Sequence, residues 1–311
     1  MWTLTDGHAG NLRQADALAE GLGVHPVKGC LLDARLPWRA WAPVLAPISR
    51  RAFGPDFAVD LSAPPLIAIG CGRQAALATR LLRARGSRVV QILDPRLDPK
   101  HWDVVIAPAH DRLRGANVIS TIGSLHPVDG QWLANGRASF TGLGDLPRPR
   151  TAVLLGGPSR HVRMGVDDCL RMVAKAQSAL QTDGGSVLLT TSRRTPSAVR
   201  DALRLRCAQM PGLIWLGAED GDNPYAGLLG WADRIVCSPD SVNMISEACA
   251  TSVPVHVFDP ARARGRLRVF LESLLAMGRI RAMAPALPTF AVTPLRETAR
   301  VAGEVRDRFG L

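Results

Sequence analysis

The stretch Asp233-Arg-Ile-Val-Cys-Ser-Pro-Asp240-Ser241-Val-Asn-Met-Ile-Ser-Glu247-Ala-Cys-Ala-Thr-Ser-Val-Pro254-Val-His-Val-Phe258 carries the signals of a strand, a polar turn, a helix and a second strand. One β-branched run ends at Cys237 and another covers residues 253–258, so two short strands are predicted. Between them, Ser238, Asp240 and Ser241 are residue types that cap a helix N-terminus. Strand, helix and strand in this order form the repeating unit of α/β folds with parallel sheets.

The polar turn of this stretch is a candidate ligand site. A helix that starts at the carboxyl end of a parallel strand points free N–H groups and the positive end of its dipole at the edge where α/β proteins bind ligands. An anion is the expected ligand of Asp240 and Ser241, and Glu247, on the second helical turn, is placed to bind a ribose hydroxyl beside a phosphate. An ordinary capped helix is the alternative, and these residues alone leave both interpretations open.

Length and composition restrict the class of protein. The chain has 311 residues, enough for two domains, and 47% hydrophobic and 21% charged residues are typical of a globular protein. No apolar run approaches the roughly 20 residues that cross a bilayer, and the N-terminus does not resemble a secretory signal, so we expect a cytoplasmic protein. The six cysteines are scattered without a C-x-x-C pair, and we predict no disulfide, no metal site and no cofactor.

The net charge of +11 comes almost entirely from arginine. Arginine binds phosphate groups well, so nucleotide phosphates and an anionic membrane surface are the expected partners. Nucleic acid is not expected, because the few aromatic residues are not interleaved with the basic clusters. The basic segment 35–53 does carry Trp38 and Trp41, which suits a protein lying on the inner face of a membrane; a helix that packs its tryptophans inward is the alternative.

The chain begins with a predicted strand, a polar turn from Asp6 to Asn11 and a helix over residues 12–22. This order places Asp6, His8, Asn11 and Gln14 at the ligand-binding edge of the first sheet. Asp6 and Asn11 are equally well explained as turn and cap residues, and His8 as an exposed side chain.

The same architecture recurs later in the chain. A buried strand at residues 65–69 is followed by the turn Gly70-Cys-Gly-Arg73, a helix and a valine-led strand, so we predict one architecture used in both halves. A further strand at residues 103–107 leads to His110 and Asp111, which lie at the level where sites form.

Residues 131–150 contain much Gly, Pro, Asn and Arg with little periodicity, which indicates a domain boundary. We predict a first domain over residues 1–147 and a second over residues 148–290. A final helix, residues 295–311, is expected to return to the first domain.

Two loops of the second half are suited to phosphate. Gly156-Gly157-Pro-Ser159-Arg160 follows a predicted strand, and Ser192-Arg193-Arg194-Thr195-Pro196 combines two arginines with hydroxyl groups between a strand and a helix. We predict that the second loop binds a diphosphate, with an ordinary solvated loop as the alternative. The turn Asn223-Pro-Tyr225 carries the only tyrosine of the chain.

These features resemble the GT-B architecture of glycosyltransferases, which has two Rossmann-like domains facing a crevice. Thr5-Asp-Gly-His8-Ala-Gly10 and the helix from Ser241 through Ser246-Glu247 to Pro254 are similar to motifs of the lipid-linked N-acetylglucosaminyltransferase family of peptidoglycan synthesis. That resemblance implies that Glu247 binds the ribose and that His8 is a base or acceptor contact.

Over nearly the whole chain the sequence resembles the bacterial family grouped with the plant elongated-mitochondria fission protein. The runs that carry this resemblance include Leu4-Thr-Asp-Gly7, Gln91-Ile-Leu-Asp94-Pro-Arg96, Thr191-Ser-Arg-Arg-Thr-Pro196 and Asp240-Ser-Val-Asn-Met244. The resemblance implies either an enzyme like a glycosyltransferase or, as in the plant members, a protein that recruits a partner to a membrane.

The expected function is metal-independent transfer of a sugar from a nucleoside diphosphate sugar to a cell-envelope acceptor. The resemblance to the lipid-linked N-acetylglucosaminyltransferase family implies that this acceptor is linked to a lipid. A non-catalytic scaffold of the same fold, with a membrane or protein partner, and a nucleotide-sugar epimerase are the alternatives.

The candidate residues follow the predicted division into two domains. The catalytic candidates are His8 and Asp6, with His110 or Asp111 as second choices for the base. The expected nucleotide-binding residues, all in the second domain, are Gly157, Ser192, Arg193, Arg194, Thr195, Asn223, Tyr225, Asp240, Ser241, Met244 and Glu247. The expected acceptor-side residues, all in the first domain, are Gly7, Gly10, Asn11, Gln14, Arg73, His110 and Asp111.

Overall fold

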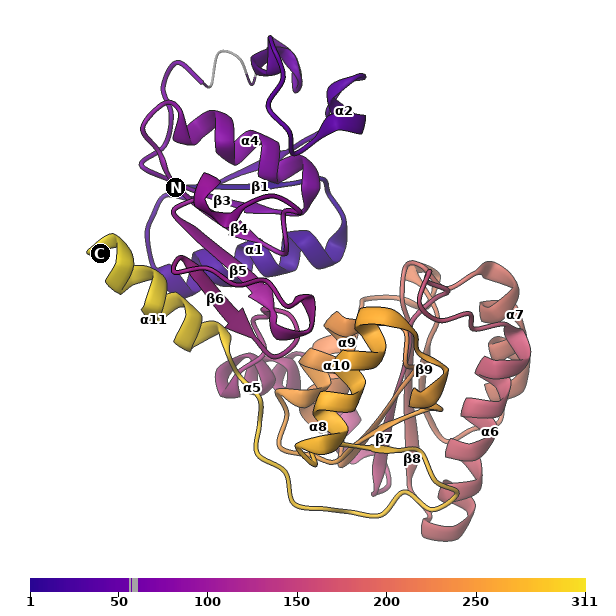
Figure 1. Cartoon of the computed structure of the whole chain (residues 1–311). Helices are drawn as coiled ribbons and strands as arrows, with labels where there is room; N and C mark the ends of the chain where they lie inside the picture. Colours follow the sequence, from indigo (N-terminus) through magenta and orange to yellow (C-terminus); the bar gives the residue numbers. More distant parts are fainter. Residues whose placement is uncertain (56, 58–60) are drawn as a thin grey trace. The chain divides into compact units, whose positions relative to one another are not determined.

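The computed structural model describes residues 1–55, 57 and 61–311, and these divide into two compact units (Figure 1). The first unit comprises Met1–Pro127 and Glu297–Leu311, and the second comprises Val128–Arg296. Each unit contains a six-stranded sheet with helices on both faces, which confirms the predicted α/β fold of two Rossmann-like domains. Within the described ranges, no helix has both the length and the apolar composition that crossing a membrane requires.

The first sheet is parallel throughout and has the strand order β2-β1-β3-β4-β5-β6. Its central strands are buried on both faces, which explains their continuous apolar sequences. The strands are β1 (Trp2–Thr5), β2 (Lys28–Leu31), β3 (Ile67–Cys71), β4 (Arg88–Ile92), β5 (Val104–Pro108) and β6 (Val118–Thr121).

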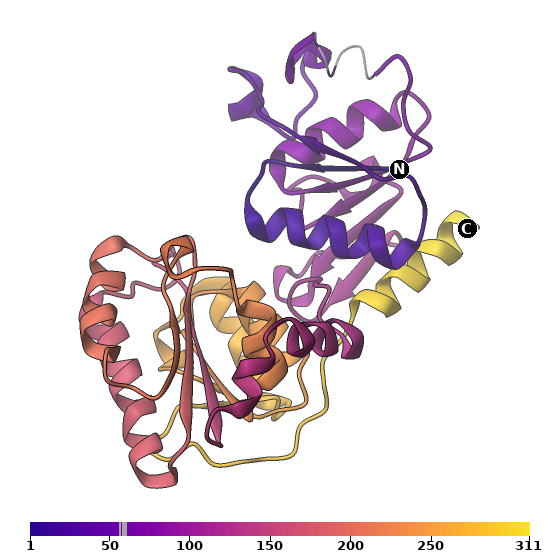
Figure 2. The ribbon, with the colours of Figure 1, turned by 180° about the vertical axis from the view of Figure 1, so that it is seen from behind.

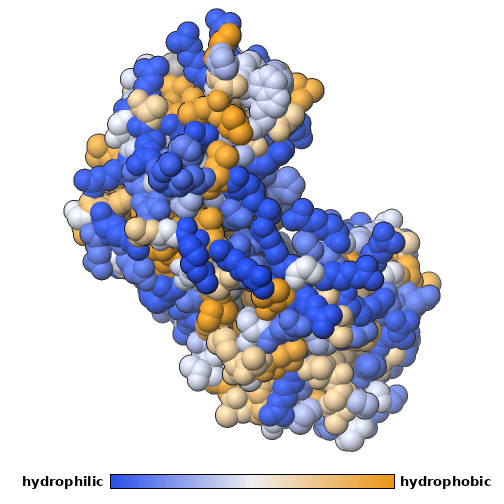
Figure 3. Space-filling view, in the orientation of Figure 1, coloured by the Kyte–Doolittle hydropathy of each residue, from blue (hydrophilic) through white to orange (hydrophobic). Residues whose placement is uncertain are grey.

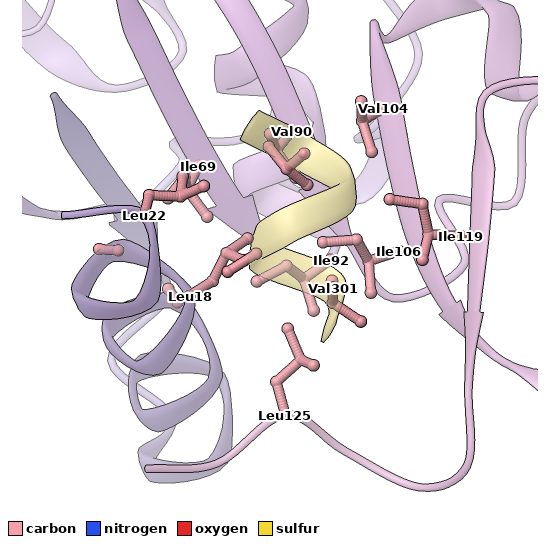
Figure 4. Close-up of a cluster of buried hydrophobic side chains, with 14 of the residues drawn as sticks. Leu18, Leu22, Ile69, Val90, Ile92, Val104, Ile106, Ile119, Leu125 and Val301 are labelled. Atoms are coloured by element: carbon pink, nitrogen blue, oxygen red, sulfur yellow. The ribbon is translucent and has the colours of Figure 1, made fainter. Parts of the chain in front are cut away.

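Helices cover both faces of the first sheet (Figures 1 and 2). On one face α1 (Ala9–Leu22) lies beside the C-terminal helix α11 (Thr298–Phe309), and α4 (Arg73–Arg83) lies on the other. Figure 4 shows the core on the α1 side, where Leu18 of α1 and Val301 of α11 meet Ile92 and Ile106 of the sheet. The last helix therefore completes the core of the first unit.

The second sheet is also parallel and has the order β12-β11-β10-β7-β8-β9. Figures 1 and 2 show α6 and α7 on one face and α8, α9 and α10 on the other. The strands are β7 (Arg150–Leu155), β8 (Ser186–Thr191), β9 (Gly212–Trp215), β10 (Arg234–Cys237), β11 (Val255–Val257) and β12 (Ile280–Ala282). The helices are α5 (Gly130–Ser139), α6 (Val166–Asp183), α7 (Ser197–Cys207), α8 (Tyr225–Trp231), α9 (Val242–Cys249) and α10 (Gly265–Ala276).

Each sheet has one pair of neighbouring strands from which the chain leaves in opposite directions. In the first sheet, β1 leads through α1 to β2, whereas its neighbour β3 leads through α4 toward the other edge. In the second sheet, β7 leads to β8 and its neighbour β10 leads to β11 on the opposite side. Open α/β sheets bind ligands outside the carboxyl ends of such a pair, the topological switch point. Asp6 and Gly72 follow the strands of the first pair, and Gly156 and Ser238 follow those of the second.

Two helices of the second unit were not expected from the sequence. The predicted boundary region is entered by α5, which begins at Gly130 and is capped by Asp129, and Tyr225 begins α8 instead of lying in a simple turn. A Cβ on Gly136 of α5 would lie 2.5 Å from the carbonyl oxygen of Ala226, so α5 and α8 pack backbone to backbone through glycine. Glycine weakens the helical pattern of the sequence, which hid both helices. Because α5 packs on α8, the units divide at residue 127, earlier than the predicted boundary at residue 147.

Candidate functional site

Hydrogen bonds join the turns that follow β7 and β10 at the switch point of the second sheet. The N–H of Gly156 donates to Ser238 Oγ at 2.8 Å, and the N–H of Gly157 donates to Asp240 Oδ2 at 2.9 Å. Ser238 Oγ donates in turn to Asp240 Oδ1 at 2.6 Å. Ser238 thus has a positioning role, although the sequence suggested it only as a helix cap.

Only glycine fits at both positions of the turn after β7. A Cβ on Gly156 would lie 2.0 Å from Asp240 Oδ2, and a Cβ on Gly157 would lie 2.3 Å from the carbonyl oxygen of Arg194. The Gly-Gly pair therefore lets a carboxylate and a second loop approach the backbone closely, as in sites where the main chain meets a ligand. A narrow crevice with no room for a water molecule adjoins this turn and is lined in part by Met164, Cys169 and Val199.

The basic loop after β8 is held in shape by its own hydroxyl groups. Ser192 Oγ accepts the N–H of Arg194 at 3.2 Å and lies 3.2 Å from Thr195 Oγ1, and Thr195 Oγ1 also donates to the carbonyl oxygen of Gly156. Thr195 is buried, whereas Arg193 and Arg194 are exposed. Ser192 and Thr195 thus present the two guanidinium groups beside the Gly-Gly turn.

Asp240 links this loop to the two turns. Its carboxylate accepts the bonds from Gly157 and Ser238, and Arg194 Nη2 lies 3.1 Å from Oδ2. Its side chain is only 1% exposed, so the carboxylate is inside the floor of the site and not on its surface. A buried carboxylate is tolerated when donors and a positive charge surround it. Asp240 therefore holds the two turns and the basic loop together.

The helix that follows Asp240 begins as the sequence indicated. Ser241 caps α9, because its Oγ accepts the N–H of Met244 at 3.3 Å. On the second turn, Glu247 is buried and its Oε2 accepts the hydroxyl hydrogen of Tyr225. Asn223 Oδ1 accepts the N–H of Tyr225 at 3.1 Å. The structure thus joins three predicted nucleotide-binding residues, Asn223, Tyr225 and Glu247, in one chain of contacts.

Further positive charge lies on neighbouring loops at the same edge of the sheet. Arg160 and Arg163 follow β7, and Arg264 follows β11; all three are exposed, and none forms an ion pair with another residue of the described ranges. Burial lowers the pKa of His161, and the charges of Arg160 and Arg266 lower it further. The edge therefore carries an excess of guanidinium groups, which favours an anionic ligand.

One acidic pair, in the loop after β9, is not among the predicted site residues. Asp220-Gly-Asp222 has the Asp-x-Asp spacing that some nucleotide-sugar enzymes use for a metal. Asp220 accepts the N–H of Leu216 at 2.7 Å and pairs with Arg204 at 2.7 Å, so its carboxylate already has structural partners. No cluster of three or more metal-ligating side chains occurs among the residues that the structure describes.

In the first unit, Asp6, His8 and Asn11 come together at the switch point between β1 and β3. Asp6 Oδ1 accepts Nδ2 of Asn11 at 2.9 Å, and Nδ1 of His8 lies 3.1 Å from the same oxygen. Burial raises the pKa of Asp6, but hydrogen bonds from Asn11 and His8 outweigh it and the net shift is downward. The imidazole of His8 is 79% exposed, and a Cβ on Gly72 would lie 2.7 Å from Asn11 Nδ2.

The remaining acceptor-side candidates have structural partners or lie away from this switch point. Gln14 is buried and donates to the carbonyl oxygen of Gly10 within α1, and Arg73 donates to the carbonyl oxygen of Arg39 at 2.9 Å. Gly7 has a φ of 76°, a left-handed backbone conformation that favours glycine, whereas its nearest neighbour is the flexible and exposed side chain of Leu31. His110 and Asp111 follow β5, which β3 and β4 separate from β1, and the two side chains approach each other to 4.0 Å.

The fold defined by these two units is that of GT-B glycosyltransferases and nucleotide-sugar epimerases. The structure of MurG from Acinetobacter baumannii is similar, with a TM-score of 0.52 and 13% identity over 99% of this chain and 90% of MurG. A UDP-GlcNAc 2-epimerase from Neisseria meningitidis, bound to UDP-GlcNAc, has a TM-score of 0.51 and 11% identity over 98% of both chains.

The chain belongs to the mitochondrial fission ELM1 family, whose model matches residues 9–309. It is 31% identical to the mitochondrial fission protein ELM1 of Arabidopsis thaliana over 273 residues, which span 78% of this chain and 63% of the plant protein. It is 24% identical to the uncharacterized protein RP120 of Rickettsia prowazekii, over 97% of this chain and 96% of that protein. The resemblance noted from the sequence is thereby confirmed.

Proposed function

We propose that this protein transfers a sugar from a nucleoside diphosphate sugar to a hydroxyl group of a cell-envelope acceptor carried on a lipid, and that it does so without a metal. The nucleotide would bind to the second unit and the acceptor to the first. The reaction would take place in the cytoplasm, at the inner face of the membrane that holds the acceptor.

One observation carries the donor side of this proposal. The bond between Arg194 and Asp240 brings the basic loop to the Gly-Gly turn at the switch point of the second sheet. The diphosphate would lie over this turn and the N-terminus of α9, where Arg193 and Arg194 would neutralise the charge that grows on the leaving nucleoside diphosphate. Glu247, oriented by Tyr225, would bind the ribose. The epimerase of the same fold that is bound to UDP-GlcNAc supports this class of ligand.

The pair formed by Asp6 and His8 supports the acceptor side. When Nδ1 of His8 donates to Asp6, Nε2 is left as a proton acceptor, and the lowered pKa of Asp6 keeps the orienting carboxylate charged. The acceptor oxygen would attack the anomeric carbon while the bond from that carbon to the phosphate oxygen breaks. The nucleoside diphosphate leaves with the electron pair, and the acceptor proton passes to His8 Nε2.

A panel of UDP-, GDP-, ADP- and CMP-sugars, with thermal stability as the readout, tests the donor site. We expect one nucleotide to raise the Tm, because a ligand that binds only the folded state stabilises it. Arg193→Gln should reduce this increase in Tm. Arg193 has no ion pair within the described ranges, so its replacement leaves the bonds of Asp240 to Gly157 and Arg194 intact. Arg206→Gln, an exposed arginine of α7, is the matched control.

The outcomes separate the proposal from its alternatives. An increase in Tm without sugar transfer, but with inversion of a stereocentre in the donor sugar, identifies an epimerase. The absence of a shift with every nucleotide contradicts the donor site and favours a non-catalytic scaffold. An equal loss in Arg193→Gln and Arg206→Gln contradicts the assignment of the basic loop.

A further inference from the structure

Exposed apolar side chains are concentrated in one segment of the first unit. Of the twelve large hydrophobic residues that are exposed among the described residues, six lie between residues 31 and 48. They are Leu31, Leu36, Trp41, Val44, Leu45 and Ile48. In Figure 3, orange side chains are prominent over the part of the first unit that carries the short helix α2 (Trp38–Trp41) in Figure 1. Contiguous exposed apolar patches on soluble proteins mark interaction sites.

Side chains of α4 anchor the backbone of this segment by hydrogen bonds. Arg73 donates to the carbonyl oxygen of Arg39 at 2.9 Å, and Nη1 of Arg80 donates to the carbonyl oxygen of Pro43 at 2.7 Å. Ser49 closes the following turn, because its Oγ accepts the N–H of Ala46 at 2.9 Å. These bonds fix the backbone on both sides of Trp41, so its exposure is a property of the folded unit and not of a loose loop.

The two tryptophans of α2 have opposite roles. Trp38 packs inward against Ala42, Ala52 and Leu77, as the inward-packing alternative expects. Trp41 is 51% exposed and remains available to a partner. A short, mostly exposed helix with one tryptophan outward is typical of an element that lies at an interface.

Exposed arginines are interspersed in sequence with these apolar residues. Arg35, Arg39, Arg50 and Arg51 are exposed, and Asp33 is the one acidic residue of the sequence from residue 31 to residue 51. Asp33 pairs with Arg39 at 3.5 Å. The remaining positive charge complements an anionic partner. We define the α2 surface as the six apolar residues given above together with these four arginines.

We propose that the α2 surface binds to the anionic surface of a lipid bilayer. Apolar side chains with a tryptophan enter the boundary between headgroups and acyl chains, and arginines at the rim bind the phosphates. A protein partner would also cover apolar groups, but an anionic lipid surface explains why the same segment exposes both apolar side chains and four arginines. Membrane binding of this kind requires neither a nucleotide nor catalysis, so it stands or fails separately from the proposed transfer reaction.

Sedimentation of the full chain with vesicles, in the absence of any nucleotide sugar, tests the proposal. We expect binding to vesicles that contain phosphatidylglycerol and little binding to pure phosphatidylcholine. The double variant Leu36→Ser and Trp41→Ser should lower the partition coefficient about tenfold or more, as should Arg50→Gln with Arg51→Gln. Leu66→Ser and Arg85→Gln, which change exposed residues of the first unit outside the α2 surface, are the matched controls and should bind as the wild type does.

Three outcomes overturn the proposal. The first is no binding of the wild type to either vesicle, and the second is equal loss in the control variants. The third is a concentration-dependent dimer in sedimentation velocity that the Leu36→Ser and Trp41→Ser variant abolishes, because a second copy of the chain would then be the occupant. Circular dichroism and Tm of each variant verify that loss of binding is not loss of folding.

Discussion

Tyr225 donates its phenolic hydrogen to the carboxylate of Glu247, and this bond joins the first residue of α8 to the second turn of α9. Glu247 is buried, so the tyrosine determines where its carboxylate points. The bond connects the Asn223-Pro-Tyr225 turn with the helix that the sequence marks as a nucleotide site, two features that lie 22 residues apart.

Replacing Tyr225 by Phe should lower stability and weaken the donor site. Removing one partner of a buried hydrogen bond leaves the other group unsatisfied and costs about 1–3 kcal/mol, so we expect a loss of that order in urea unfolding. In the proposed enzyme the KM for the nucleotide sugar should rise more than kcat falls, because the acceptor-side residues are unchanged. A variant with normal donor affinity would show that Tyr225 does not orient Glu247 for the ribose.

Gly156→Ala should disrupt the hydrogen bonds that join the turns after β7 and β10 in the second unit. The new Cβ would lie 2.0 Å from Asp240 Oδ2, and relief of this clash requires Asp240 to leave Gly157 and Ser238. Loss of bonds to a buried carboxylate costs about 3–5 kcal/mol. Gly303→Ala is the control: nothing lies within 4 Å of its Cβ, and the change in α11 should stabilise by about 0.5–1 kcal/mol. Equal Tm values for the two variants would contradict the packing described.

His256 should make the protein less stable in mild acid. It is buried on β11 and packs edge to face against Phe290, and burial, with the charges of Arg234 and Arg281, lowers its pKa to about 4. The unfolded chain, with a pKa of about 6.5, then binds more protons than the folded protein, so stability falls as pH drops from about 6.5 to about 4 and changes no further through this group below that.

Urea unfolding of the wild type and of His256→Leu between pH 4 and pH 8 measures this effect. A pKa shift of this size corresponds to a loss of unfolding free energy on the order of 3 kcal/mol across this pH window in the wild type, and the loss in the variant should be smaller by that amount. Parallel curves for the two proteins would mean that the pKa of His256 is the same in the folded and unfolded states.

His8→Ala tests the proposed base. Loss of a general base lowers kcat by about 10²–10⁴-fold, whereas the Tm shift with the nucleotide sugar should remain, because that ligand binds to the second unit. His25→Ala, an exposed histidine of the first unit, should leave kcat unchanged. Retention of full kcat in His8→Ala would remove His8 from the chemistry.

Local patterns allowed much of the fold to be predicted. The strand at residues 234–237, the cap at Ser241 and the helix after it depend on neighbouring residues, and the structure has them as β10 and α9. The helices α5 and α8 were not predicted, because glycines at their contact weaken the helical pattern and only the partner helix explains their presence.

The sequence from Asp233 to Phe258 by itself determined a strand, a capped helix and a strand, because hydrophobic periodicity and capping act over a few residues. The sequence of the second half also predicted that Asp240, Arg194 and Glu247 belong to one nucleotide-binding site. Only the tertiary structure decided what each side chain does: Asp240 turns inward to hold Gly157 and Arg194, and Glu247 meets Tyr225. Such contacts depend on which strands become neighbours in the sheet, and that order follows from the packing of the whole unit.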